Sequence, residues 1–221
     1  MDYAAARANM VEHQIRACRV LDPDLLDFLS RMPRERFVPE ELRSIAYMEG
    51  HVPLPCGQEM LSPLQEARIL QQLALSGDEE ILLIGAGSGY LTALLAMQAR
   101  FVLACEIHRE LVDFATRNLR DLGIDNARVI QLNGLDPEAC EEIDGGPFDV
   151  LVIAAAVDEI PRHLRDRVAP GGEVIAFVGS NPVVELLHQR LLPDGGVETT
   201  RVMETLLADA EGAVKPREFV F

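Results

Sequence analysis

Three glycines at alternate positions, Gly85, Gly87 and Gly89, directly follow the apolar run of residues 81–84. Such a turn can bring backbone N–H groups close to a ligand, because glycine adopts left-handed conformations and has no side chain in the way. The spacing is G-x-G-x-G, and Tyr90 stands where a dinucleotide-binding turn has its third glycine. This spacing argues against NAD as the ligand. The alternative interpretation, that the glycines serve only to pack the strand against the helix, is not excluded by the sequence.

An acidic residue, Glu106, ends the next apolar run, 21 residues after Gly85. A carboxylate at this edge of a parallel sheet can accept hydrogen bonds from both hydroxyls of a ribose. The alternative is a solvated glutamate that favours the positive end of the following helix. The third run ends in Asn133-Gly134, where an amide could contact an adenine edge, although Asn-Gly suits a turn equally well. These positions indicate a nucleoside ligand.

Short apolar runs alternate with amphipathic helices from about residue 79 onward. We expect strands at 80–84, 101–105, 128–132, 149–154 and 173–178, and helices near 89–98, 109–122 and 158–168. Runs that are apolar on both faces belong to a parallel sheet covered by helices on both sides. The turn at 193–196 predicts a closing antiparallel hairpin with final strands around 198–206 and 216–221. The fold class is therefore α/β, with a doubly wound, mostly parallel sheet.

Residues 1–76 have a different character. Helical patterns cover 2–17, about 23–31 and 63–75, with Asp22 as an N-cap and Pro23 at the first helical position. The segment between the last two helices is rich in proline and predicts loops. We expect a helical cap and acceptor loop over 1–76 and an α/β core over 77–221, within one domain.

Composition excludes several function classes. The 221 residues carry a formal charge of −16, and no cluster of lysine or arginine offsets it, so nucleic-acid binding is not expected. The four cysteines are widely spaced, with no histidine at ligand spacing, which argues against a metal site. No run approaches the roughly 18 apolar residues of a membrane span, and the charged N-terminus does not read as a signal peptide. A cytoplasmic location fits these features.

The residues around the glycine turn resemble motif I of class I S-adenosylmethionine (SAM) methyltransferases, and the chain is similar to protein-L-isoaspartate O-methyltransferases. The matching segments, in family order, are MVEHQIRACRVLD, PRERFVP, AYMEGHVPLPCGQ, GAGSGYLTALLA, EIHREL, FDVLVIAAAVDEIP and APGGEVIAFVG. The resemblance implies methyl transfer from SAM to the free carboxylate of isoaspartyl residues in proteins or peptides, a step in protein repair, with S-adenosylhomocysteine as product. A carboxylate with a pKa of about 4 is already ionised, so no general base is required.

The resemblance also assigns residues to the site. It places the cofactor on Gly85, Ala86, Gly87, Ser88, Gly89, Glu106, Ile107, Asn133 and Gly134. It places the acceptor on Gln58, Glu59 and Leu61, with Ser62 as the candidate catalytic residue.

The acceptor loop departs from the family pattern Thr-Ile-Ser-x-Pro. Leu61 stands at the serine position, and Ser62 falls one residue later. Ser62 also fits a capping box with Pro63 at N1 and Gln65 at N3, which is a purely structural role. A hydroxyl lost at Leu61 removes a hydrogen bond worth about 1.5–3 kcal/mol to a charged acceptor.

Motif I departs as well. An acid usually stands two residues before its first glycine and helps to fix the ammonium of SAM, and here that residue is Leu83. Asn133 replaces the aspartate of the family's Gly-Asp-Gly and can still accept a hydrogen bond. Glu59 would repel an anionic acceptor, and His51 is the histidine beside the acceptor loop. Two alternatives stay open: a methyltransferase with a different acceptor, and a relative that binds a nucleoside or protein without chemistry. The sequence leaves the oligomeric state undetermined.

Overall fold

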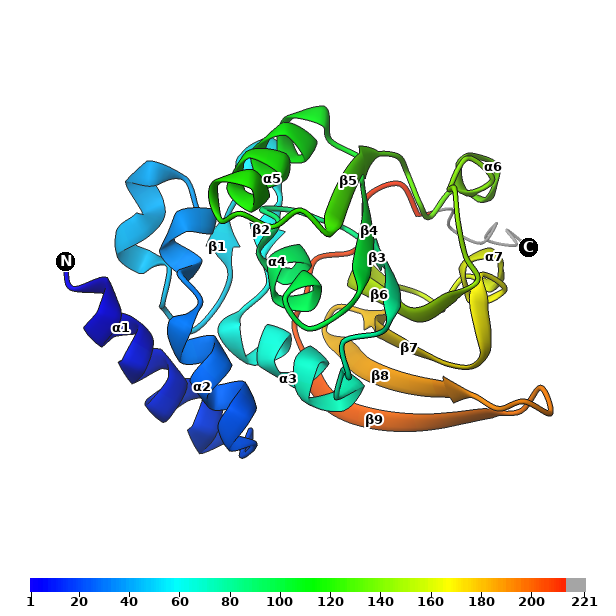
Figure 1. Ribbon diagram of the computed structural model, residues 1–221, viewed down its shortest axis with the longest axis horizontal. Helices are drawn as coiled ribbons and strands as arrows, with labels where there is room; N and C mark the ends of the chain where they lie inside the picture. The colour runs from blue at the N-terminus through cyan, green and yellow to red at the C-terminus, as the bar shows by residue number, and fades with distance from the viewer. Residues whose placement is uncertain (214–221) are drawn as a thin grey trace.

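The computed structural model describes residues 1–213 and contains one large mixed sheet (Figure 1). Its seven strands lie in the order β5-β4-β3-β6-β7-β8-β9. They are β3 (Glu80–Ile84), β4 (Phe101–Glu106), β5 (Ala127–Gln131), β6 (Phe148–Val157), β7 (Val168–Ser180), β8 (Val183–Leu191) and β9 (Val197–Thr205). The first five pair in parallel, whereas β8 and β9 are antiparallel to their neighbours. The predicted fold class is confirmed.

Alternate residues of the central strands feed two hydrophobic clusters. Leu83 belongs to the cluster packed by α3 (Pro63–Leu73), α4 (Tyr90–Ala96) and α5 (Arg109–Asp121). Its neighbours Leu82 and Ile84 belong to the cluster packed by the short helices α6 (Pro137–Cys140) and α7 (Arg162–Arg165). Because successive side chains of a strand point to opposite faces, apolar residues at every position predict a sheet that is covered on both sides.

The strand order reverses at β3. The chain runs from β3 through β4 to β5 at one edge of the sheet, and then returns to β6, which is hydrogen-bonded to the other side of β3. Ligands of open α/β sheets bind outside the carboxyl ends of the strands at such a reversal. The glycine turn follows the last residue of β3 and therefore lies at this position.

The N-terminal region packs its helices against the α3 and α4 side of the sheet (Figure 1). The helix predicted over 2–17 is α-helical only in α1 (Tyr3–Met10). It continues as a wider π turn, η1 (Val11–Ile15), and a tighter 3-10 turn, η2 (Arg16–Cys18), and Arg19 ends it with a left-handed φ of 65°. The next helix, α2 (Pro23–Arg31), starts as predicted, because the Asp22 carboxylate accepts hydrogen bonds from two backbone N–H groups.

The loop-rich segment contains only short elements. They are three 3-10 turns, η3 (Arg34–Phe37), η4 (Glu40–Ile45) and η5 (Pro55–Gly57), and a two-stranded ladder of β1 (Val52–Pro53) and β2 (Glu59–Met60). Within residues 1–213, no helix is both long and apolar enough to cross a membrane.

Two further predicted elements, the closing hairpin and the helix over 158–168, differ from the structure. The hairpin around the 193–196 turn pairs β9 with β8, a strand absent from the prediction because Val183–Leu191 lacks regular alternation of apolar and polar residues. The strand predicted at 216–221 lies outside the described residues. The helix predicted over 158–168 shortens to α7, because Pro161 precedes its first residue and β7 already begins at Val168.

Candidate cofactor and acceptor site

The glycine turn adopts backbone conformations that other residues rarely take. Gly85, Gly87 and Gly89 have φ values of 90°, 53° and 83°. At Gly89 an added Cβ would lie 3.0 Å from both Cα and Cβ of Ala115 in α5, so this glycine also allows α4 and α5 to pack closely. The turn itself is fixed to β4, because the Gly85 N–H donates to the Cys105 carbonyl at 2.9 Å.

Glu106 lies at the carboxyl end of β4 and faces the turn. Its Oε2 accepts a hydrogen bond from the Gly87 N–H at 2.8 Å, and its Oε1 accepts one from the His108 N–H at 3.1 Å. The residue is only 5% exposed, so the carboxylate is held in one orientation. A carboxylate oxygen can accept two hydrogen bonds, so each oxygen retains capacity for one more. This arrangement fits a ligand with two neighbouring hydroxyl groups.

A cavity of about 70 Å³ opens beside this carboxylate. Its lining joins most of the predicted nucleoside-binding positions: Gly85, Glu106, Ile107, Asn133 and Gly134. The Asn133 Oδ1 accepts a hydrogen bond from the Leu135 N–H at 3.1 Å. The side chain therefore stabilises a turn, which is the structural alternative that the Asn-Gly pair suggests. A Cβ at Gly134 would lie 2.5 Å from Cδ1 of Ile84, so a side chain there would displace the end of Ile84.

A C-terminal segment, residues 206–213, closes one side of this cavity and was not predicted to do so. The Ala210 N–H donates to the Ala156 carbonyl at 2.7 Å, which ties the segment to the end of β6. The Glu211 carboxylate accepts from the Gln58 amide at 3.0 Å and lies 3.0 Å from His108 Nε2. Gln58, predicted to contact the acceptor, therefore lies at the rim of the nucleoside cavity. No periodicity in the short segment signals this position.

Leu61 and Ser62 line different cavities. Leu61 and Glu59 contribute to a cavity of about 40 Å³ that also contains Ala86, Gly87 and Ser88 of the turn. Ser62 lines a separate cavity of about 260 Å³ with His51 and Gln65. The residue that replaces the family serine therefore faces the cofactor turn, and Ser62 does not.

Ser62 has a structural role in this arrangement. Its Oγ accepts from the Gln65 N–H at 3.3 Å, and the Gln65 side chain accepts from the Ser62 N–H at 2.8 Å. Both bonds of the predicted capping box are present at the start of α3.

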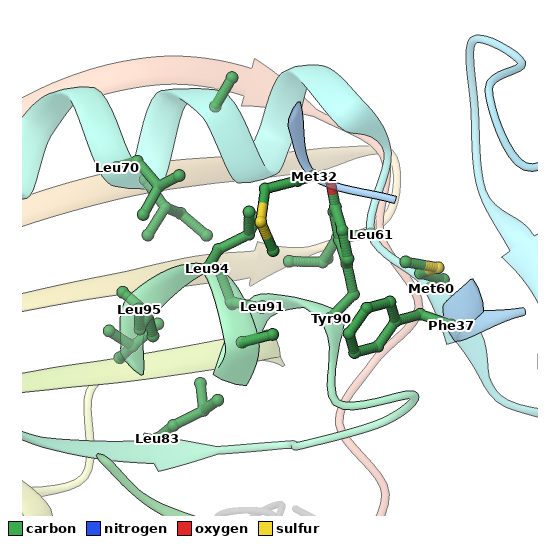
Figure 2. Close-up of a cluster of buried hydrophobic side chains, with 14 of the residues drawn as sticks. Met32, Phe37, Met60, Leu61, Leu70, Leu83, Tyr90, Leu91, Leu94 and Leu95 are labelled. Carbon is green, nitrogen blue, oxygen red and sulfur yellow. The ribbon is translucent and has the colours of Figure 1, made fainter. Parts of the chain in front are cut away.

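Leu83 is fully buried, and Figure 2 shows it below Leu91 and Leu94 of α4, in the cluster that also contains Leu61. An acid is thus absent from the end of β3. The structure instead brings an unpredicted carboxylate, Glu66 of α3, to the cavity that Leu61 shares with the turn, and pairs it with Arg34. Arg34 belongs to the PRERFVP segment, whose resemblance to the family was the signal in the sequence that could have indicated a role for Arg34.

Comparison with known proteins identifies relatives over most of the chain. The family model described as Protein-L-isoaspartate(D-aspartate) O-methyltransferase (PCMT) matches residues 5–210. A Protein-L-isoaspartate O-methyltransferase 1 of Rhodopseudomonas palustris is 37% identical over 84% of this chain and 74% of its own. One from Koribacter versatilis is 34% identical over 90% of this chain and 88% of its own.

A solved structure supports the same fold. It is that of a protein described as a protein-L-isoaspartate O-methyltransferase from Plasmodium falciparum, in complex with S-adenosyl-L-homocysteine. The match covers 92% of this chain and 97% of the solved chain at 22% sequence identity, with a TM-score of 0.75.

The reversal of strand order, the glycine turn and the facing carboxylate, together with the family match over residues 5–210, define a SAM-dependent methyltransferase of class I. Within that class, this chain belongs to the protein-L-isoaspartate O-methyltransferase family.

Proposed function

We propose that this protein transfers the methyl group of SAM to the free carboxylate of isoaspartyl residues in proteins and peptides. The observation that carries the proposal is the Glu106 carboxylate, held against the glycine turn by Gly87 and His108 with one accepting position left on each oxygen. These positions suit the two ribose hydroxyls of the cofactor. Family membership over residues 5–210 supplies the acceptor class.

Each predicted cofactor residue has a role in this proposal. Glu106 binds the ribose, Ile107 and Asn133 flank the base, and Gly134 leaves the space that a side chain would fill. Gly85, Ala86, Gly87, Ser88 and Gly89 form the turn along which the amino-acid part of the cofactor lies. When bound, SAM supplies a methyl group on a positively charged sulfur that a carboxylate can attack in line.

The acceptor side needs to position its substrate rather than to activate it. The acceptor carboxylate is ionised at neutral pH, so its attack requires no proton transfer. Alignment of carboxylate and methyl accounts for up to about 7–11 kcal/mol of the barrier through proximity alone. Glu59 and Leu61 lie where the acceptor would approach the turn, Gln58 supports the rim of the nucleoside cavity, and Ser62 caps α3.

The protein surface is compatible with a protein acceptor and not with nucleic acid, because the net charge of −16 repels phosphate backbones. The four cysteines are free thiols, which suits the reducing cytoplasm. We propose this location and a single functional domain over 1–221.

Methyl transfer from labelled SAM to paired peptides tests the proposal. One peptide carries isoaspartate, and its control has the same sequence with ordinary aspartate. We expect label on the isoaspartyl peptide alone. If neither peptide is labelled but calorimetry still shows binding of S-adenosylhomocysteine, the result would favour a methyltransferase with a different acceptor. This is the second candidate function, because Leu61 stands where the family has a hydroxyl. Absence of binding would contradict the cofactor site itself.

A further inference from the structure

Arg34 and Glu66 form a buried ion pair beside the glycine turn. The Arg34 side chain is fully buried, and that of Glu66 is 3% exposed. The Arg34 Nη1 donates to Glu66 Oε2, its Nε donates to the Ala46 carbonyl at 2.8 Å, and its Nη2 donates to the Leu61 carbonyl. The guanidinium also lies 5.0 Å from the centre of the Tyr90 ring. Arg34 is therefore fixed on several sides.

Stability alone is a weak reason for this pair. Removing two charges from water is costly, and apolar residues of similar size often stabilise a fold equally well. The surroundings here are largely apolar, since Phe37, Tyr90 and Leu91 belong to the same buried cluster. The pair is therefore consistent with a role beyond stability.

The cavity next to Glu66 indicates which ligand. Glu66 lines the space of about 40 Å³ that it shares with Gly85, Gly87 and Leu61. Arg34 engages Oε2, and Oε1 makes no hydrogen bond with any other side chain or backbone group in the described part of the chain. The carboxylate thus faces the turn where the amino-acid part of the cofactor is proposed to lie.

We propose that Glu66 receives the α-ammonium group of SAM, in place of the acid that motif I lacks at Leu83. This inference rests on the proposed function and adds a cofactor-positioning residue to it. The carboxylate reaches the turn from α3 instead of from the end of β3. Arg34 holds it in place and neutralises part of its charge, so that it repels an approaching acceptor carboxylate less strongly.

The charges around Glu66 support this role. Burial raises the pKa of Glu66 to about 7, although the charge and hydrogen bond of Arg34 act to lower it. Glu59 of β2 lines the same cavity, and its carboxylate is 3.2 Å from His51 Nδ1. Tyr90 of α4 lies beside the Arg34–Glu66 pair, outside the cavity lining. A bound ammonium group would favour the ionised form of Glu66.

Calorimetry with two ligands tests the inference. S-adenosylhomocysteine carries the ammonium group, and 5′-methylthioadenosine has the same nucleoside without the amino acid. In Glu66→Gln we expect affinity for S-adenosylhomocysteine to fall about tenfold or more, and that for 5′-methylthioadenosine to change less than about twofold. Glu41→Gln, at an exposed position, is the matched control and should change neither affinity.

Equal losses for both ligands, or no loss for either, would overturn the role of Glu66. If the wild-type protein binds neither ligand, the proposed function fails instead. Should Glu66→Gln not fold, Glu66→Asp retains the charge on a shorter side chain and should weaken only S-adenosylhomocysteine.

A measurement on the wild-type protein needs no variant. Because burial raises the pKa of Glu66 to about 7, Glu66 of the free protein gains a proton as the pH falls, and this proton must leave before the carboxylate can pair with an ammonium group. Affinity for S-adenosylhomocysteine should therefore fall by up to about tenfold in total as the pH decreases from 8 to 6, with 5′-methylthioadenosine nearly unaffected. Parallel pH profiles for the two ligands would contradict the inference.

Discussion

The two ends of the crevice are built differently. The proposed nucleoside end consists of backbone geometry and one carboxylate: the turn at Gly85–Gly89 and Glu106, which two backbone N–H groups hold. The proposed methyl-transfer end consists of side chains from separate elements, with Leu61 and Glu66 lining one cavity and Arg34 bonded to both residues. The first end keeps the glycines and the acidic residue of the family pattern and changes only at Asn133, whereas the second departs from the pattern at Leu61 and Leu83.

This difference shows which features of a site can be rearranged. A glycine turn tied to the neighbouring strand has no substitute elsewhere in the chain, because its conformation and its close approach are local properties. A charge, by contrast, can come from any element that reaches the same space. Leu83 and Glu66 fit such an exchange between β3 and α3.

Glu106→Gln should have the largest effect. The amide can accept at only one of its two terminal atoms, so one backbone N–H and one ribose hydroxyl lose a partner. We expect affinity for S-adenosylhomocysteine to fall by up to about 100-fold, from the loss of one charged hydrogen bond to the ribose of about 1.5–3 kcal/mol. Titration calorimetry measures this, with exposed Glu141→Gln as control. Affinity within a few-fold of wild type would contradict the assigned role of Glu106.

Gly89→Ala should reduce stability more than Gly123→Ala does. Both positions have positive φ, 83° and 77°, and share a backbone cost of about 1–2 kcal/mol. Only Gly89 has a packed neighbour: a Cβ there lies 3.0 Å from Ala115, and at Gly123 it meets nothing within 4 Å. We expect a further loss of about 1–3 kcal/mol at Gly89 from overpacking. Equal urea midpoints for the two variants would show that the contact between α4 and α5 can relax.

Leu61→Ser tests the methyl-transfer end. Restoring a hydroxyl beside the turn should raise activity on isoaspartyl peptide about tenfold, through one hydrogen bond to the acceptor carboxylate. Leu61→Ala creates similar space without a hydroxyl and is the matched control. Equal rates for the two variants would place the acceptor elsewhere.

Ser62→Ala should have the smallest effect. Loss of the helix cap should reduce the free energy of unfolding by about 1 kcal/mol, and kcat of the folded protein should change less than about twofold. Exposed Ser44→Ala provides the control for chemical denaturation. A large fall in kcat with unchanged stability would assign the hydroxyl to the reaction.

For a physical reason, the sequence predicted the local geometry around the glycine turn and the start of α3 better than the contacts between distant segments. Glycine spacing, strand-ending residues and the capping box of Ser62 are local patterns, and the structure contains all of them. Glu66 meets Arg34 across 32 residues of chain, and Glu211 meets Gln58 across 153. Such contacts depend on how helices and the C-terminal segment pack, which no local pattern encodes. The strand β8 was missed because its face pattern is irregular.

A crystal structure of the protein with S-adenosyl-L-homocysteine tests the central claim most directly. The account predicts both ribose hydroxyls within hydrogen-bond distance of the Glu106 carboxylate, and the ammonium group at Glu66 Oε1. A Glu106 side chain turned away from the sugar, or a ligand bound outside the crevice at the end of β3, would contradict it.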